Sequence, residues 1–69
     1  MIEHETEERL SREAAAAKLH ALADELDRHN EVSFENDGRR FTVDVPDEVT
    51  YKLEIEVGES NEIEIEISW

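Results

Sequence analysis

Cysteine is absent from this 69-residue chain, which also has only one proline and two glycines. Without cysteine, neither a disulfide nor a thiolate zinc site can stabilise the fold. A domain of this length buries only about 60% of the surface that its unfolded chain exposes. We therefore expect a single domain over residues 1–69 with a thin core, stabilised by packing, by association with another chain or by the solvent.

Long apolar runs and basic residues are also missing. No segment approaches the roughly 20 apolar residues of a membrane helix, and the first residues lack the pattern of a signal peptide. These absences predict a cytoplasmic protein that is not inserted in a membrane. Seven lysine and arginine residues stand against 20 acidic residues, which gives a net charge of −13. Because phosphates attract basic surfaces, this charge argues against nucleic acid and anionic membranes as partners.

The acidic excess indicates a salt-rich environment. At ordinary ionic strength such a charge repels itself and destabilises the compact state. At molar salt the screening length falls to about 3 Å, and most of this repulsion disappears. Only Lys18 and Lys52 are lysines. We expect this balance in a halophilic protein, and the regular spacing of the apolar residues argues against a disordered acidic tail.

One helix is predicted from Arg12 to about His29. Ser11 offers its hydroxyl as N-cap, and Glu13 places a negative charge in the first turn, where the helix dipole favours it. The helix is expected to end near Asn30, since asparagine tolerates the left-handed backbone of a C-cap. A narrow apolar stripe recurs at helical spacing: Ala15, Leu19, Leu22 and Leu26.

After residue 31 the apolar period changes from 3.6 to 2, which indicates strands. Asp37-Gly38 is a preferred pair for a two-residue type I′ turn, and this turn places Phe34 opposite Phe41. A proline-containing break follows, and then apolar and polar residues alternate along two further segments: Val49–Val57 and Ile63–Trp69.

The pairing of these last two segments is left open between two registers. Val57 opposes either Asn61 or Ile63, because directly opposed residues share a face. The second register is preferred, since it keeps asparagine off the apolar face, and it places Tyr51 opposite Trp69. In both registers glutamates oppose glutamates on the outer face, which is destabilising unless salt or cations screen them.

The sequence thus predicts an α+β fold in which one amphipathic helix packs on one face of a four- to five-stranded, mainly antiparallel sheet. Residues 2–8 alternate weakly and are expected to form an edge strand, which gives the order β-α-β-β-β-β. A helix about 10–12 Å wide cannot cover four strands spaced about 4.8 Å apart. The missing cover is the N-terminal segment, a second copy of the chain in a homodimer, or a protein partner bound in a groove.

Three features together resemble a known family. Leu10–Ala15 opens the helix, Val45–Val49 forms the Pro-Asp-Glu turn, and alternating glutamate and isoleucine strands close on Ile67-Ser68-Trp69. This pattern is similar to that of the amphi-Trp domain family, small proteins common in halophilic archaea. The resemblance spans the whole chain and implies this fold and a high-salt habitat. It implies neither an activity nor catalytic residues.

The polar residues form no pattern typical of catalysis or metal binding, so we expect no enzyme, cofactor or metal site. Of the three histidines, His20 and His29 lie about 13.5 Å apart along the helix axis and cannot share a metal. His4 lies among glutamates that bind a divalent ion weakly at most. The serines lack a His/Asp context for a nucleophile. A glutamate ladder is expected on the outer sheet face, where it holds hydrated cations weakly: Glu54, Glu56, Glu62, Glu64 and Glu66.

Trp69 is the residue with two competing interpretations. It is either a hydrophobic plug that closes the core between helix and sheet, or an exposed anchor for a partner, since tryptophan is enriched at binding hot spots. The candidate partner-binding residues are Trp69, Tyr51 and Ile67. The leading hypothesis is a non-enzymatic interaction module, and the alternative is a small-ligand or cation-binding protein with a pocket under the helix.

Overall fold

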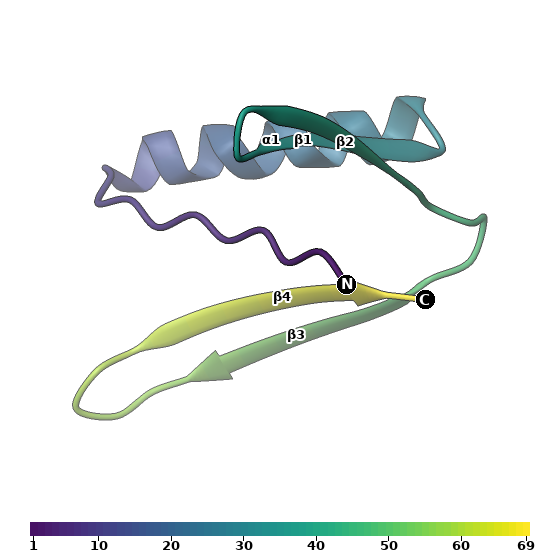
Figure 1. Cartoon of the computed structure of the whole chain (residues 1–69). Helices are drawn as coiled ribbons and strands as arrows, with labels where there is room; N and C mark the ends of the chain where they lie inside the picture. The colour runs from purple at the N-terminus through teal and green to yellow at the C-terminus, as the bar shows by residue number, and fades with distance from the viewer.

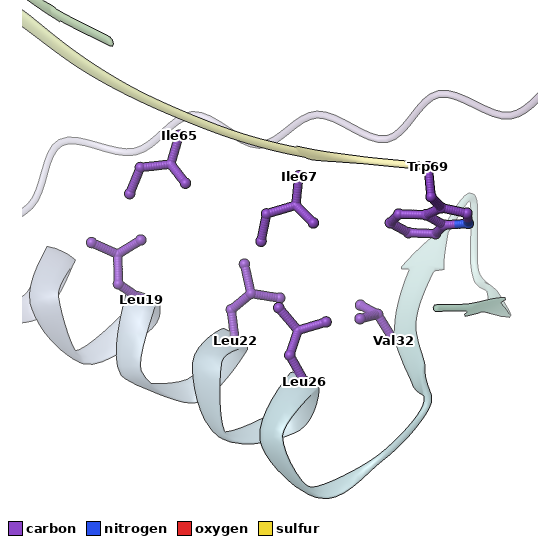
Figure 2. Close-up of a pocket in the computed structure, with 7 residues that line it drawn as sticks. All are labelled: Leu19, Leu22, Leu26, Val32, Ile65, Ile67 and Trp69. Atoms are coloured by element: carbon purple, nitrogen blue, oxygen red, sulfur yellow. The ribbon is translucent and has the colours of Figure 1, made fainter. Parts of the chain in front are cut away.

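The computed structural model describes the whole chain, residues 1–69, as an α+β fold with one helix and four strands. In chain order these are α1 (Arg12–Arg28), β1 (Glu31–Asn36), β2 (Arg39–Asp44), β3 (Thr50–Glu56) and β4 (Glu62–Ser68). The helix and the β1–β2 hairpin form one layer and the β3–β4 hairpin forms the other, with the N-terminal segment running between them (Figure 1). The apolar side chains of α1 and β4 point toward each other across this space (Figure 2).

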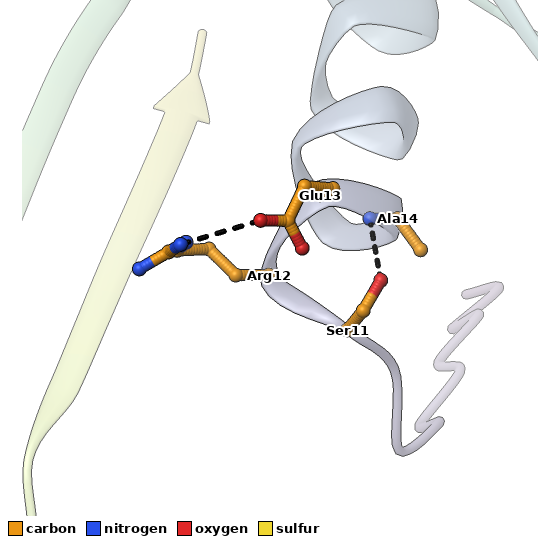
Figure 3. A network of polar contacts seen from close by, with 4 residues as sticks. All are labelled: Ser11, Arg12, Glu13 and Ala14. Atoms are coloured by element: carbon orange, nitrogen blue, oxygen red, sulfur yellow. Dashed lines mark hydrogen bonds and ion pairs between the residues drawn. The ribbon is translucent and has the colours of Figure 1, made fainter.

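The start of α1 follows from its capping residues. Ser11 has an extended backbone, and its hydroxyl accepts a hydrogen bond from the Ala14 N–H at 3.0 Å (Figure 3). Glu13 lies in the first turn, as predicted, where it complements the helix dipole. The only helix of the chain is neither long nor apolar enough to cross a membrane.

The end of α1 lies close to its predicted position, but the predicted cap geometry is wrong. The last helical residue is Arg28, and His29 is extended, with its N–H donating to the Glu25 carbonyl at 3.0 Å. Asn30 does not have a positive φ, so the left-handed C-cap predicted there is wrong. The chain passes directly into β1, and the Asn30 carbonyl already accepts a bond from the Val45 N–H at 2.7 Å. The extended backbone at His29 places the Asn30 carbonyl next to Val45, so that this hydrogen bond can form.

The β1–β2 hairpin confirms the predicted turn and register. Asp37 has φ 54° and Gly38 has φ 75°, the two positive values that a type I′ turn requires. Phe34 pairs with Phe41, and their rings stack with centroids 5.5 Å apart. Turn chemistry and apolar pattern therefore fixed this hairpin together.

The β3–β4 hairpin has the other of the two registers. Tyr51 pairs with Ile67, so the preferred register, with Tyr51 opposite Trp69, is wrong. The observed ladder ends with Glu56 opposite Glu62, which is the register in which Val57 would face Asn61. As expected for either register, glutamates oppose each other on the outer face of this hairpin.

The Asn61 side chain explains this register. Its Oδ1 accepts a hydrogen bond from the Gly58 N–H at 3.2 Å, so the polar group is satisfied inside the turn rather than stranded on the apolar face. The loop between the paired strands spans residues 57–61, and this hydrogen bond closes it.

The single continuous sheet is not confirmed. β1 pairs only with β2, and β3 pairs only with β4, so the strands form two separate two-stranded sheets. Residues 2–8 form no strand, and the predicted edge strand is therefore absent. This segment has almost no apolar side chains to bury, so pairing gains little from packing. It nevertheless runs beside β1, where the His4 ring lies 5.1 Å from that of Phe34.

The chain is more open than a finished domain of its size. Its radius of gyration is 13.8 Å, whereas roughly 11 Å is expected for 69 residues. It exposes 6701 Å², whereas a folded monomer of 8.0 kDa exposes about 4,500 Å². No residue is fully buried. The core is therefore incomplete, because the layer of α1, β1 and β2 stands apart from the β3–β4 hairpin.

Candidate functional site

A hollow lined only by hydrophobic residues lies between α1 and β4. One wall comes from the helix and the other from the strand, and Val32 of β1 closes one end (Figure 2). The hollow has a volume of about 280 Å³ and is lined by seven hydrophobic residues: Leu19, Leu22, Leu26, Val32, Ile65, Ile67 and Trp69.

A second hollow of about 210 Å³ continues the first toward β3 and is also lined only by hydrophobic residues. It adds Tyr51 and Ala23, and it shares the helix leucines and both isoleucines with the first. Because they share these lining residues, the two hollows are together called the apolar slot here. Its lining residues contribute no charged side chain.

Two local periods bring these side chains to the slot. The leucines at positions 19, 22 and 26 fall on one face of α1, which has 3.6 residues per turn. Residues 65, 67 and 69 are every second residue along β4 and its end, so their side chains share one face. One side-chain hydrogen bond positions β1 against α1. The partly buried Ser33 N–H donates to the Glu25 carboxylate at 2.9 Å. Backbones of the two layers do not approach closely, so the slot stays open.

All three residues predicted to bind a partner line this slot. Trp69 is 60% exposed and lies at its end beside Val32, while Ile67 is half-buried at its centre (Figure 2). Tyr51, the cross-strand neighbour of Ile67, lies on the same face and lines the slot toward β3. Tyr51 lies directly across from Ile67, and Trp69 follows Ile67 by two residues. Trp69 and Tyr51 are therefore diagonal neighbours rather than an opposed pair.

Sequence reasoning treated the helix leucines only as core residues and left Val32 out of the site. In the structure they form the wall that faces Trp69. The narrow leucine stripe could have indicated that these leucines belong to the site. A stripe too narrow to cover a sheet leaves part of that sheet accessible beside it.

The opposite face of β3 and β4 is strongly acidic. Glu54 pairs with Glu64 and Glu56 pairs with Glu62, while Lys52 opposes Glu66. Like charges directly opposed on a sheet are destabilising by about 0.2–1 kcal/mol. The hairpin therefore has one apolar and one anionic face.

Compensating ion pairs are few and lie on the surface. The three pairs are Arg12–Glu13 at 3.3 Å (Figure 3), Lys18–Glu8 at 3.3 Å and Lys52–Glu54 at 3.9 Å. Exposed pairs of this kind contribute at most about 1 kcal/mol each. They leave most of the negative charge without a partner.

The histidines and carboxylates do not gather into a reactive group. No three His, Asp or Glu side chains are placed to hold one metal ion. His4 instead lies against Phe34. No polar side chain is buried, so no carboxylate has the desolvated surroundings in which general acids and bases work.

Comparison with known proteins assigns a family to this chain. The family model described as the Amphi-Trp domain matches residues 1–69, the whole chain. No curated protein and no solved structure matches it. The family match confirms the resemblance seen in the sequence, and any function has to be argued from the slot itself.

Proposed function

The chain belongs to the Amphi-Trp domain family, and from its apolar slot we propose that it is a non-enzymatic binding domain that receives an apolar segment of a protein partner. The observation that carries this proposal is a slot lined only by hydrophobic side chains, with Trp69 still 60% exposed at its end. Tryptophan is the residue type most typical of binding hot spots.

The lining favours a protein segment over a small ligand. Small-molecule sites are apolar but carry a few convergent polar groups that orient the ligand. The lining side chains of the slot offer only two polar groups, the Tyr51 hydroxyl and the Trp69 indole N–H, and no charged or amide group. An amphipathic helix or strand needs no such groups, since it inserts apolar side chains and keeps its polar face in water.

Charge limits the partner further. At molar salt the net charge of −13 acts over only about 3 Å, so it favours basic and disfavours acidic side chains in direct contact with the domain rather than steering distant proteins. The matching partner presents apolar side chains flanked by arginine or lysine. We place this binding in a cytoplasm of molar salt, where the acidic surface remains compatible with a folded domain.

Replacing the slot's tryptophan provides the direct test. We expect Trp69→Ala to lose capture of the partner by about 30-fold, the effect of removing a hot-spot side chain worth about 2 kcal/mol. The measurement is a pull-down at molar KCl, followed by binding of the purified captured protein. Trp69 is the only tryptophan, so a blue shift of its fluorescence on binding reports directly on the slot.

Val49→Ala is the matched control. Val49 lies next to the end of the same hairpin but does not line the slot, so this variant is expected to capture the partner like the wild type. Equal capture by Trp69→Ala would contradict the proposal. Loss of the helical circular dichroism signal in Trp69→Ala would make Trp69 a structural plug and would contradict it as well.

We also propose that the two hairpins join into one sheet at molar salt, with residues 2–8 as the connecting strand. β1 and β4 each have one unpaired edge, and the N-terminal segment lies between the two layers (Figure 1). A strand, a helix and a parallel strand make a right-handed crossover unit, and the contact of His4 with Phe34 supports this place for the segment. Its glutamates repel the acidic chain at low salt.

Amide hydrogen exchange tests this joining. In molar KCl we expect slow exchange at several amides within residues 2–8, because a central strand is hydrogen-bonded on both sides. In dilute buffer the same amides are expected to exchange fast. Fast exchange of all of them in molar KCl would show that the segment joins no sheet.

A further inference from the structure

The outer half of the β3–β4 hairpin carries an apolar surface that the slot does not use. Ile55, Val57 and Ile63 are 63%, 82% and 71% exposed, and Leu53 lies on the same face. None of these four residues lines the slot. They are here called the hairpin face, and the helix does not cover them.

The composition of the hairpin face is entirely aliphatic. Ile55 pairs directly with Ile63, and all charged side chains of this part of the hairpin lie on the other face. A surface without polar groups offers no hydrogen-bond pattern to a dissimilar partner. It is complementary to another aliphatic surface, and a second copy of the chain supplies one of the same size.

The exposed area leaves room for a dimer interface. The chain exposes 6701 Å², about 2,200 Å² more than a folded monomer of its mass. The hairpin face supplies part of this excess, since Ile55, Val57 and Ile63 are 63%, 82% and 71% exposed. Homodimer interfaces are the more apolar class, which fits an aliphatic surface.

We propose that the hairpin face is a homodimer interface, in which two copies pack their β3–β4 hairpins face to face about a two-fold axis. Each hairpin then forms one layer of a two-layer sandwich with sheets about 10 Å apart. The same surface serves both copies, as a two-fold axis requires. Glu54, Glu56, Glu62 and Glu64 point outward on both sides, where molar salt screens their repulsion.

Sedimentation equilibrium of the full chain in molar KCl is the first test. The wild type is expected to sediment at about 16 kDa, twice the mass of the chain. Ile63→Glu places two carboxylates in the apolar interface and is expected to weaken dimerisation at least about 100-fold. Glu64→Gln, on the outer face of the same strand, is expected to remain a dimer. A monomeric wild type, or a dimeric Ile63→Glu, would overturn the proposal.

Disulfide trapping locates the interface without relying on a destabilised variant. The chain has no cysteine, so Ile55→Cys introduces a single thiol on the hairpin face and Glu54→Cys a single thiol on the outer face. Oxidation is expected to cross-link Ile55→Cys and not Glu54→Cys. Cross-linking of Glu54→Cys alone would place the interface elsewhere and overturn the proposal.

A monomer would identify the alternative cover of the hairpin face. If the Ile55→Cys thiol resists alkylation in that monomer, the chain's own N-terminal segment covers the face. If the thiol reacts rapidly, the face is left for a different protein. Either result overturns the homodimer.

This interface is independent of partner binding in the slot, and the two proposals fail separately. Trp69→Ala is expected to dimerise normally, and Ile63→Glu is expected to keep the wild-type Trp69 emission, because Ile63 does not line the slot. If the chain is a dimer but captures no partner, the homodimer interface is supported and partner binding in the slot is contradicted. If the chain is a monomer that captures a partner through Trp69, partner binding is supported and the homodimer is contradicted.

Discussion

In molar KCl the domain is expected to be folded, and at about 0.1 M salt it is expected to lose most of its helical and tertiary structure. The net charge of −13 is spread over a chain in which no residue is buried. Three exposed ion pairs oppose this charge. Lowering the salt from 1 M to 0.1 M lengthens the screening distance from about 3 Å to about 10 Å, so repulsion reaches across the whole hairpin.

The measurement is a titration of far-UV circular dichroism and Trp69 emission with KCl. Glu64→Lys turns the repulsive pair with Glu54 into an attractive one, and we expect it to fold at lower salt than the wild type. Glu59→Lys is the matched control, since it makes the same charge change in a turn outside the β3–β4 ladder. It is expected to shift the transition less.

A wild type that stays equally stable from dilute buffer to molar KCl would contradict the halophilic interpretation. Equal shifts in Glu64→Lys and Glu59→Lys would assign the salt dependence to net charge rather than to the opposed glutamates. The two variants therefore separate a long-range effect from a cross-strand one.

Leu26→Asp is expected to remove a large part of the stability of the domain in molar KCl. Leu26 is half-buried and lines the slot against Val32 and Ile67. The substitution removes apolar contacts and places a charge in an apolar hollow, which together cost about 2–3 kcal/mol. A domain of this size rarely has more than about 3–5 kcal/mol of stability, so the loss is a large part of the total.

Urea unfolding in molar KCl measures this loss. Ala17→Asp is the matched control, because it adds the same charge to an exposed position of α1 that lines no part of the slot. It is expected to cost about 0.7 kcal/mol or less, the difference in helix propensity. Equal destabilisation by both substitutions would mean that the leucine stripe does not contribute to the core.

The features that the sequence determined are those with local causes. The Ser11 cap and the leucine stripe defined the start and the inner face of α1. Two residues, Asp37 and Gly38, fixed the β1–β2 register, since a type I′ turn permits only one pairing. Strand parity placed Tyr51, Ile67 and Trp69 on one face, and all three line the slot.

Other features depended on contacts that the sequence pattern does not encode. The β3–β4 register was decided by one hydrogen bond from Gly58 to Asn61, which turned a residue counted as a liability into part of the turn. The end of α1 was decided by the neighbouring hairpin, where Asn30 accepts a bond from Val45. The β3–β4 register and the end of α1 each depend on a single polar contact, which the spacing of apolar residues does not reveal.

The sequence alone determined a helix with a narrow apolar stripe, two hairpins with assigned faces, a net charge of −13 and the family. Only the tertiary structure decided that the hairpins form separate sheets and that α1 and β4 face each other across an open slot. The physical reason is range. Caps and turns are fixed by neighbours in the chain, whereas the spacing of the two layers depends on packing between residues 19–26 and residues 65–69, which no local pattern specifies.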